Sequence, residues 1–284
     1  MDPAASAALA ADPARALALL REGELRIHGR LTEASNAAFY CTVGGVDGGT
    51  DGGAGADGDG RAVCVYKPVR GERPLWDFPD GTLAGREVAA YEVSAATGWH
   101  LVPPTVLREG PYGEGMCQIW VESDPEAQLL ALQDAEDAEP GWCAIGRAEV
   151  GEGRTALLVH ADDARLRRLA VLDAVLNNAD RKGGHLLPAV DGRIYGIDHG
   201  VTFAVPGKLR TLLWGWAGEP LPAEAAEALT GLREQLDGPL GERLAALLTA
   251  AEVDAVRQRV AGLLRTGLHP LPSGEWPAVP WPPI

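Results

Sequence analysis

Hydrophobic and polar residues follow different patterns in the two halves of the chain, and the pattern changes near residue 122. Before that point, short apolar runs separated by turn residues predict β-strands. Two helices are predicted among them, over 13–22, between Asp12 as N-cap and Gly23, and over 85–99. The predicted strands cover residues 24–30, 37–43, 62–66, 105–108 and 116–121.

After residue 122 the apolar positions recur at helical spacing, which predicts a mainly helical second half. A short hairpin turned by Asp191-Gly192 interrupts the helices. The proline-rich stretch 269–284 cannot be helical, and we expect Trp276 and Trp281 to pack it onto the second half. The predicted helices cover residues 161–176, 223–236, 241–248 and 253–264.

These patterns predict an α+β protein with two lobes, a β-rich N-lobe over 1–122 and a mainly helical C-lobe over 123–284. Residues 44–60 consist almost entirely of Gly, Asp and Ala, so we interpret them as a flexible, enlarged hairpin tip. Such an insertion is tolerated because the entropy of closing a loop grows slowly with its length.

Composition narrows the classes of partner. Hydrophobic residues make up 46% of the chain, which indicates a globular protein, and the formal net charge is −15. That charge repels nucleic acid and anionic lipid surfaces, so neither is an expected partner. No apolar run reaches the length of a membrane span, and the N-terminus lacks the basic residues of a signal peptide, so we expect a cytoplasmic protein without integral membrane association. The four cysteines form no CxxC pair, which favours reduced thiols over a zinc site.

The candidate chemistry lies around the predicted hairpin. Asp180 follows a helix, and Asp198 ends a strand before His199-Gly200. Two carboxylates in this order are typical of phosphoryl transfer, where catalysis consists mainly of positioning and charge neutralisation. Asp180 would then orient the acceptor hydroxyl as a base, and Lys182 would neutralise the transferring phosphoryl group. Asp198 and His185 would bind a divalent metal; the alternative is a polar loop beside a hairpin.

The first half offers groups for the phosphates of a nucleotide. Lys67 ends a predicted strand, and Glu87 lies in the next helix, where it could pair with that lysine. Glu92 is a second possible partner, and a solvated lysine is the alternative. Ser35 and Asn36 lie in a turn of small polar residues that could cover phosphates, although Ser-Asn is also ordinary turn chemistry.

Other motifs are absent or misplaced. Residues 53–58 match G-x-G-x-x-G, but they open no helix and belong to the Gly/Asp stretch. The chain contains no G-x-x-x-x-G-K-[ST], H-E-x-x-H or G-x-S-x-G, so P-loop, zincin and α/β-hydrolase functions lack their motifs.

The run Asp173-x-x-x-x-Asn178-x-Asp180-Arg181, followed by a hairpin and Ile197-Asp198-His199-Gly200, resembles the catalytic and metal-binding loops of type II phosphatidylinositol 4-kinases and HipA-like kinases. It is more closely similar to an uncharacterised actinobacterial group labelled phosphatidylinositol 3-/4-kinase-like. The resemblance extends from about Gly23 to the C-terminus. It implies an atypical protein-kinase-like fold that uses ATP and Mg²⁺.

By the same resemblance, Lys67 is the phosphate-binding lysine, Asp180 the catalytic aspartate and Asp198 the metal-binding aspartate. A hinge near 118–122 would contact adenine, through Ile119, Trp120 and Val121. The chain departs from the family pattern at His185, where asparagine is usual, and imidazole is a poorer ligand for a hard cation.

The resulting prediction is a kinase that transfers the γ-phosphate of ATP to a hydroxyl of an unknown soluble acceptor, either a protein or a small molecule. An ATP-binding pseudokinase with a regulatory role is the first alternative, favoured by His185, and an AMP-transferring enzyme on the same fold is the second. An acceptor would dock just after Asp198; the indoles there are more consistent with packing. The residues concerned are Lys208, Arg210, Trp214 and Trp216.

Overall fold

The computed structural model describes residues 9–32, 36–44, 61–134, 136–149, 151 and 153–283. Ser35 and almost all of the Gly/Asp stretch therefore lie outside the described residues, and the predictions for them stay predictions. Within the described ranges, no helix is long and apolar enough to cross a membrane.

A five-stranded antiparallel sheet forms the first lobe, with strand order β1-β2-β3-β5-β4. Each strand falls where the apolar runs predicted it, and Lys67 near the end of β3 pairs with Met116 of β5. Helix α2 (Pro13–Glu22) begins at Asp12, whose side chain accepts the Arg15 N–H, and packs on β4 and β5. The strands are β1 (Glu24–Arg30), β2 (Phe39–Gly44), β3 (Arg61–Pro68), β4 (Thr105–Gly110) and β5 (Gly113–Ile119).

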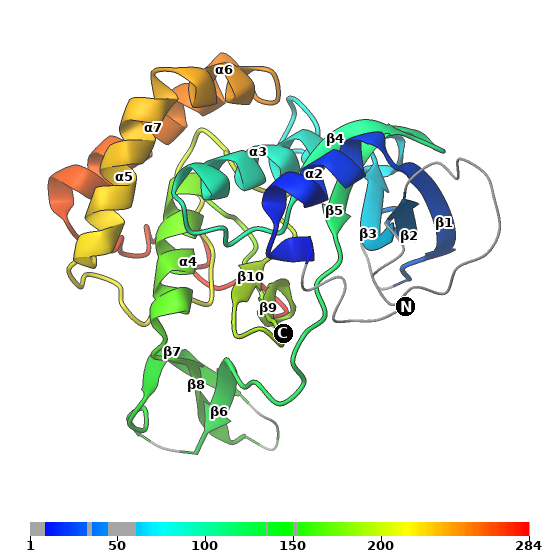
Figure 1. Ribbon diagram of the computed structural model, residues 1–284. Helices are drawn as coiled ribbons and strands as arrows, with labels where there is room; N and C mark the ends of the chain where they lie inside the picture. Colours follow the sequence, from blue (N-terminus) through cyan, green and yellow to red (C-terminus); the bar gives the residue numbers. More distant parts are fainter. Residues whose placement is uncertain are drawn as a thin grey trace.

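Helix α3 (Leu83–Ala96) lies between the sheet and the helices of the second lobe (Figure 1). It packs against β4 and β5 on one side and against α5 (Ala223–Leu236) and α6 (Pro239–Ala245) on the other. Arg86 of α3 donates hydrogen bonds to Glu252 of α7 (Ala250–Thr266) and, at 3.1 Å, to the carbonyl of Thr202. Because Arg86 and Glu252 are both buried, this ion pair links α3 to the second lobe, and the loss of either partner would leave the other charge buried and unpaired.

The second lobe is built around α4 (Ala164–Leu176), whose leucines pack into one core with α5, α6 and α7. After α4 comes the predicted hairpin of β9 (Leu186–Pro188) and β10 (Ile194–Gly196), with Gly192 in the left-handed region that its turn requires. The remaining helices are α5 (Ala223–Leu236), α6 (Pro239–Ala245) and α7 (Ala250–Thr266). The boundary at residue 122 stays a prediction.

A second sheet was missed by the sequence analysis. Strands β6 (Leu130–Gln133), β7 (Trp142–Glu149) and β8 (Thr155–Ala161) form a three-stranded sheet of order β6-β8-β7 below α4 (Figure 1). The helix predicted to begin at 161 begins three residues later, after Asp163 accepts the Arg165 N–H. Periodicity alone cannot separate a short buried strand such as β8 from the first turns of a helix.

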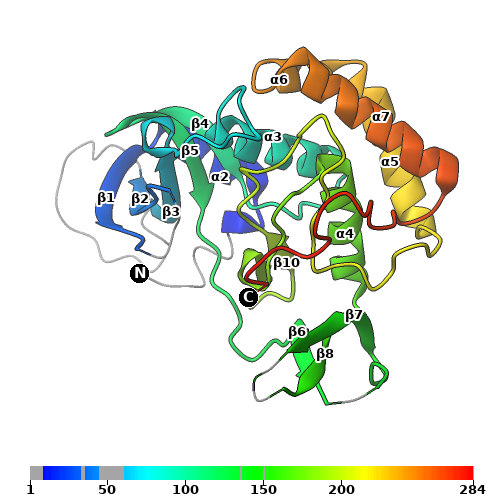
Figure 2. The ribbon, with the colours of Figure 1, turned by 180° about the vertical axis from the view of Figure 1, so that it is seen from behind.

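The tail after α7 is non-helical, as its prolines predicted, and crosses the second lobe (Figure 2). Trp276 is half-buried, but the expected packing of Trp281 is wrong, because its side chain is 84% exposed. The neighbouring Pro280 is buried in its place. Trp214 and Trp216 are buried, which confirms the packing interpretation of those two indoles.

His269 at the start of this tail gives stability a pH dependence. The ring is 4% exposed and its Nε2 accepts a hydrogen bond from Arg167 Nε at 3.2 Å. Burial, followed by the charge of Arg167, lowers the pKa of His269 to about 4. The unfolded chain, with an ordinary histidine pKa near about 6.5, therefore takes up the proton first as pH falls.

We expect the free energy of unfolding to fall between about pH 6.5 and pH 4, by up to about 1.4 kcal/mol per pH unit. His269→Gln keeps an acceptor for Arg167 and should reduce that loss. Urea unfolding at several pH values measures both proteins. An identical pH slope in the variant contradicts the assignment to His269.

Candidate active site

A cleft of about 1040 Å³ separates the two lobes, and most of the predicted site residues line it. They come from the turn after β1, from β3, from α3, from the end of β5, and from the loops before and after the β9–β10 hairpin. The predicted residues that line the cleft are Asn36, Lys67, Glu87, Trp120, Asp180, Lys182, His185 and Asp198.

Lys67 lies between two carboxylates from distant parts of the chain. Its Nζ donates to Glu87 Oε1 of α3 at 2.8 Å and to Asp198 Oδ1 of the second lobe. Burial opposes the charge on Lys67, but the two carboxylates, Glu87 first, outweigh it and raise the pKa of the lysine. Glu92, the other possible partner, pairs instead with Arg243.

Glu87 joins α3 to the loop that carries Asp198. Its second oxygen, Oε2, accepts the backbone N–H of His199 at 2.9 Å, and its side chain is buried. Asp198 itself has φ 58°, a left-handed conformation that turns the chain sharply into His199-Gly200. Glu87 therefore sets the position of the lysine and of this turn together.

Asp198 keeps one side open to the cleft, with 42% of its side chain exposed. Burial would raise the pKa of this carboxyl, but the charge of Lys67 outweighs burial and holds the pKa well below its usual range. His185 Nε2 lies 3.5 Å from Asp198 Oδ2. Burial lowers the pKa of His185 despite that carboxylate, which favours the neutral ring, and its Nδ1 accepts the Lys182 N–H at 3.4 Å.

A divalent metal ion on this cleft would need oxygen or nitrogen ligands from its side chains. Among the described residues, no cluster of three or more His, Cys, Asp and Glu side chains is placed to hold a metal ion by itself. Mg²⁺ in phosphoryl-transfer sites is commonly held by one or two carboxylates together with phosphates and water. Asp198, partly exposed on the cleft, could hold a magnesium ion together with phosphates, and His185 could add a weaker nitrogen ligand.

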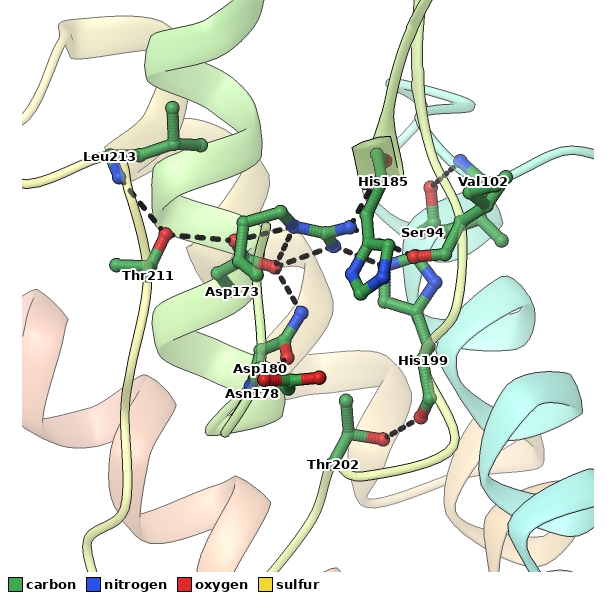
Figure 3. A network of polar contacts seen from close by, with 12 residues as sticks. Ser94, Val102, Asp173, Asn178, Asp180, His185, His199, Thr202, Thr211 and Leu213 are labelled. Carbon is green, nitrogen blue, oxygen red and sulfur yellow. Dashed lines mark hydrogen bonds and ion pairs between the residues drawn. The ribbon is translucent and has the colours of Figure 1, made fainter. Parts of the chain in front are cut away.

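A buried ion pair holds the loop that carries Asp180 (Figure 3). Asp173 of α4 binds Arg181 in a two-pronged contact, with Nη2 to Oδ1 at 2.8 Å and Nε to Oδ2 at 3.0 Å, and both side chains are fully buried. Asn178 donates to the same carboxylate at 2.9 Å and accepts the Asp180 N–H at 3.0 Å. Arg181 also donates to the Ile197 carbonyl at 2.9 Å, which links the two loops.

Asp180 faces the cleft from this loop. Its Oδ2 lies 3.0 Å from Lys182 Nζ, and both side chains remain partly exposed. In this arrangement the carboxylate of Asp180 could accept a proton, while the ammonium of Lys182 could stabilise negative charge on a bound group.

The three residues of the predicted hinge differ in where their side chains lie. Trp120 lines the cleft, but the side chains of Ile119 and Val121 are buried in the core of the first lobe and do not. The alternation of a strand explains this, because successive side chains point to opposite faces. Ile119 and Val121 can therefore offer only backbone groups to a ligand.

Glu72 was missed by the sequence analysis. It lines the cleft, and its two oxygens accept the Leu83 and Ala84 N–H groups, at 2.9 and 2.8 Å, at the start of α3. The next residue, Arg73, donates its N–H to Asn36 Oδ1 at 3.0 Å. Residues 72–73 therefore connect the turn after β1 to α3, a link that no local motif marks.

No protein-family model matches the chain, but solved structures share its fold. A crystal structure of the Golgi casein kinase with Mn/ADP bound is 14% identical, with a TM-score of 0.51 over 90% of this chain and 75% of that chain. Such a likeness shows the fold alone, and it confirms the two-lobed α+β kinase-like fold. The proinflammatory kinase CtkA of Helicobacter pylori is 9% identical over 88% of this chain and 94% of that chain, with a TM-score of 0.41, which is too low to support a conclusion about the fold.

A relative is found at much higher identity. Protein Rv2133c of Mycobacterium tuberculosis is 48% identical over 274 residues, which cover 93% of this chain and 94% of that protein. Identity and coverage of this extent leave one conclusion, that the chain belongs to the same family as Protein Rv2133c.

Proposed function

We propose that the chain is an atypical kinase that binds ATP with Mg²⁺ and transfers the γ-phosphate to a hydroxyl of an acceptor. The observation that carries the proposal is Lys67, held between Glu87 and Asp198 on the cleft that Asp180 also faces. A kinase-like fold supports it, and the Golgi casein kinase structure carries Mn/ADP. The relation to type II phosphatidylinositol 4-kinases and HipA-like kinases remains part of this proposal.

Each group has a task in that reaction. Lys67 would bind the phosphates, and Asp180 would orient the acceptor hydroxyl and take its proton. Lys182 would neutralise charge on the transferring group, and Asp198 with His185 would hold the metal. Bound Mg²⁺ supplies further neutralisation of the phosphates. Ser35 and Asn36 would cover the phosphates from the turn after β1.

The base of the nucleotide would lie beside Trp120. Its indole lines the cleft, with Nε1 donating to Glu122 at 3.1 Å and the ring edge-on to Tyr40 at 5.4 Å. In the part of the chain that the structure describes, no backbone carbonyl accepts the N–H of Val121. This N–H could therefore donate to a ring nitrogen of adenine.

Labelled nucleotides test the proposal against its two rivals. Purified protein with Mg²⁺ should release label from γ-labelled ATP to an acceptor and leave α-labelled ATP as ADP. Transfer of the α-label indicates AMP transfer. Nucleotide binding without transfer of either label indicates a pseudokinase, and the absence of any binding refutes all three.

Glu72 offers a separate prediction about nucleotide affinity. Glu72→Ala removes the link between the turn after β1 and α3, so we expect about three- to tenfold weaker binding of Mg·ADP, in line with the loss of one helix cap. A fluorescent ADP analogue measures the affinity.

Thr82→Ala is the matched control. Thr82 Oγ1 accepts the Gly85 N–H at 2.9 Å and caps the same helix without contacting the turn after β1. We expect this variant to bind Mg·ADP nearly as well as the original protein. Equal losses in both variants indicate that Glu72 acts only as a helix cap.

A further inference from the structure

The tail segment 276–283 crosses the second lobe (Figure 2) and contacts the end of the loop that carries Asp180. The carbonyl of Pro283 accepts the N–H of Gly183 at 2.8 Å, immediately after Lys182. The carbonyl of Ala278 accepts two hydrogen bonds from the second lobe, from Thr211 N at 3.0 Å and from Trp214 Nε1 at 2.8 Å. The tail is therefore held at both ends of the segment.

The surface under the tail adjoins the loop that carries Asp180. Arg210 donates its N–H to the Asn178 carbonyl at 2.8 Å, and its own carbonyl accepts the Arg181 N–H at 3.0 Å. Residues 208–214, termed here the ledge, thus run beside the loop of Asp180. An extended polypeptide binds such a ledge through its backbone donors, and those of Thr211 and Gly183 are already occupied by the tail.

A second segment, from the first lobe, lies beside the same loop. Leu75 lines the cleft, and Phe78 packs against Ala179 and Ala204 of the second lobe. Asp77 forms an ion pair with Lys208 at the start of the ledge. Residues 75–78 therefore reach from the first lobe to the second beside the loop that carries Asp180.

Lys208 contacts both the tail and the segment 75–78 of the first lobe. Its side chain is 5% exposed, and Nζ lies 4.4 Å from the ring centroid of Trp276 in the tail. The same Nζ lies 5.2 Å from the ring of Trp76 and 5.3 Å from that of Phe78. A desolvated ammonium among aromatic rings and a carboxylate is strongly held, so tail and first-lobe segment are fixed together.

From these contacts we infer that the acceptor is a small hydroxyl compound that enters the cleft, and not a polypeptide. The inference rests on the proposed kinase function. About 1040 Å³ is at the upper end of the volumes of small-molecule sites and leaves room beside a nucleotide. In the reaction, the acceptor oxygen bonds to the γ-phosphorus, the bond to the β-phosphate oxygen breaks, ADP leaves with that electron pair, and Asp180 takes the hydroxyl proton.

To test the inference, the whole protein is incubated with Mg²⁺ and γ-labelled ATP and, in separate reactions, with each of two fractions of an extract from its source organism. One is the protein-free ultrafiltrate and the other is the retained protein. We expect label in a compound of the ultrafiltrate, at least tenfold above label on protein. Label on protein overturns the inference. No label in either fraction while Mg·ATP binds also overturns it, whereas failure to bind Mg·ATP marks failure of the proposed function itself.

Two tail variants test whether the tail by itself excludes a polypeptide acceptor. Trp276→Ala removes the ring that covers Lys208, and Trp281→Ala, at an exposed position of the same tail, is the matched control. We expect neither variant to label protein. Label on protein that appears at least tenfold above background in Trp276→Ala alone shows that the tail blocks a polypeptide acceptor, which overturns the inference. Arg210→Gln, which loses only the 3.0 Å bond from its Nε to the Pro277 carbonyl, provides a second release variant if Trp276→Ala does not fold.

Discussion

Asp180→Asn is expected to lower the rate of phosphoryl transfer by about 10²- to 10⁴-fold. Asparagine preserves the shape of the side chain and its contact with Lys182, 3.0 Å away in the present structure, but it cannot take the acceptor proton. The change leaves Lys67, Glu87 and Asp198 in place, so we expect the affinity for Mg·ATP to change by less than about threefold. Initial rates with γ-labelled ATP and direct nucleotide binding measure the two quantities.

Asp191→Asn is the control for that variant. Asp191 lies in the turn of the β9–β10 hairpin, where it pairs with Arg193 at 3.6 Å and is exposed. Removing this charge should leave the rate nearly unchanged. An Asp180→Asn protein with the original rate eliminates Asp180 as the base. A large loss of nucleotide affinity instead indicates that Asp180 acts mainly as a metal ligand.

Arg181→Met is expected to cost the largest amount of stability, about 3–5 kcal/mol in the free energy of unfolding. The substitution leaves the Asp173 carboxylate fully buried without its two bonds from Arg181 and breaks the bond to the Ile197 carbonyl. Urea unfolding measures the loss. Lys182→Met, at a partly exposed ion pair one residue away, should change stability by less than about 1 kcal/mol.

A double variant distinguishes the unpaired charge from lost packing. Arg181→Met with Asp173→Leu removes both charges, and such replacements often restore stability. We expect the double variant to be more stable than Arg181→Met alone. If it is less stable, the hydrogen bonds that Asp173 accepts from Asn178 and Thr211 outweigh the cost of its unpaired charge.

Several helices and turns could be predicted because short-range interactions that the sequence shows determine them. Asp12 caps α2, Gly192 allows the turn of the hairpin, and α5 covers the residues that its pattern predicted. Each depends on contacts within a few residues. The missed sheet of β6, β7 and β8 and the exposed Trp281 depend on what packs against them, and a local pattern does not contain that information.

The same division separates the residues of the site. The Asn178-Ala-Asp180-Arg181 run and the Asp198-His199-Gly200 turn are continuous in the chain, so their chemistry was open to prediction. Glu72 has no such motif, because its function depends on two N–H groups of a helix that begins eleven residues later. The tail carries prolines that exclude a helix, but nothing in them indicates which donors their carbonyls would meet.

By itself, the sequence determined the five strands of the first sheet, most of the helices, the acidic charge and the chemical groups offered at residues 67, 87, 180 and 198. Only the tertiary structure decided that Lys67 meets Asp198, 131 residues away, and that the tail covers the ledge beside Asp180. Spacing along the chain specifies local geometry through backbone hydrogen bonds. Contacts between distant residues arise from the packing of whole elements, here α3 between the sheet and the helices of the second lobe.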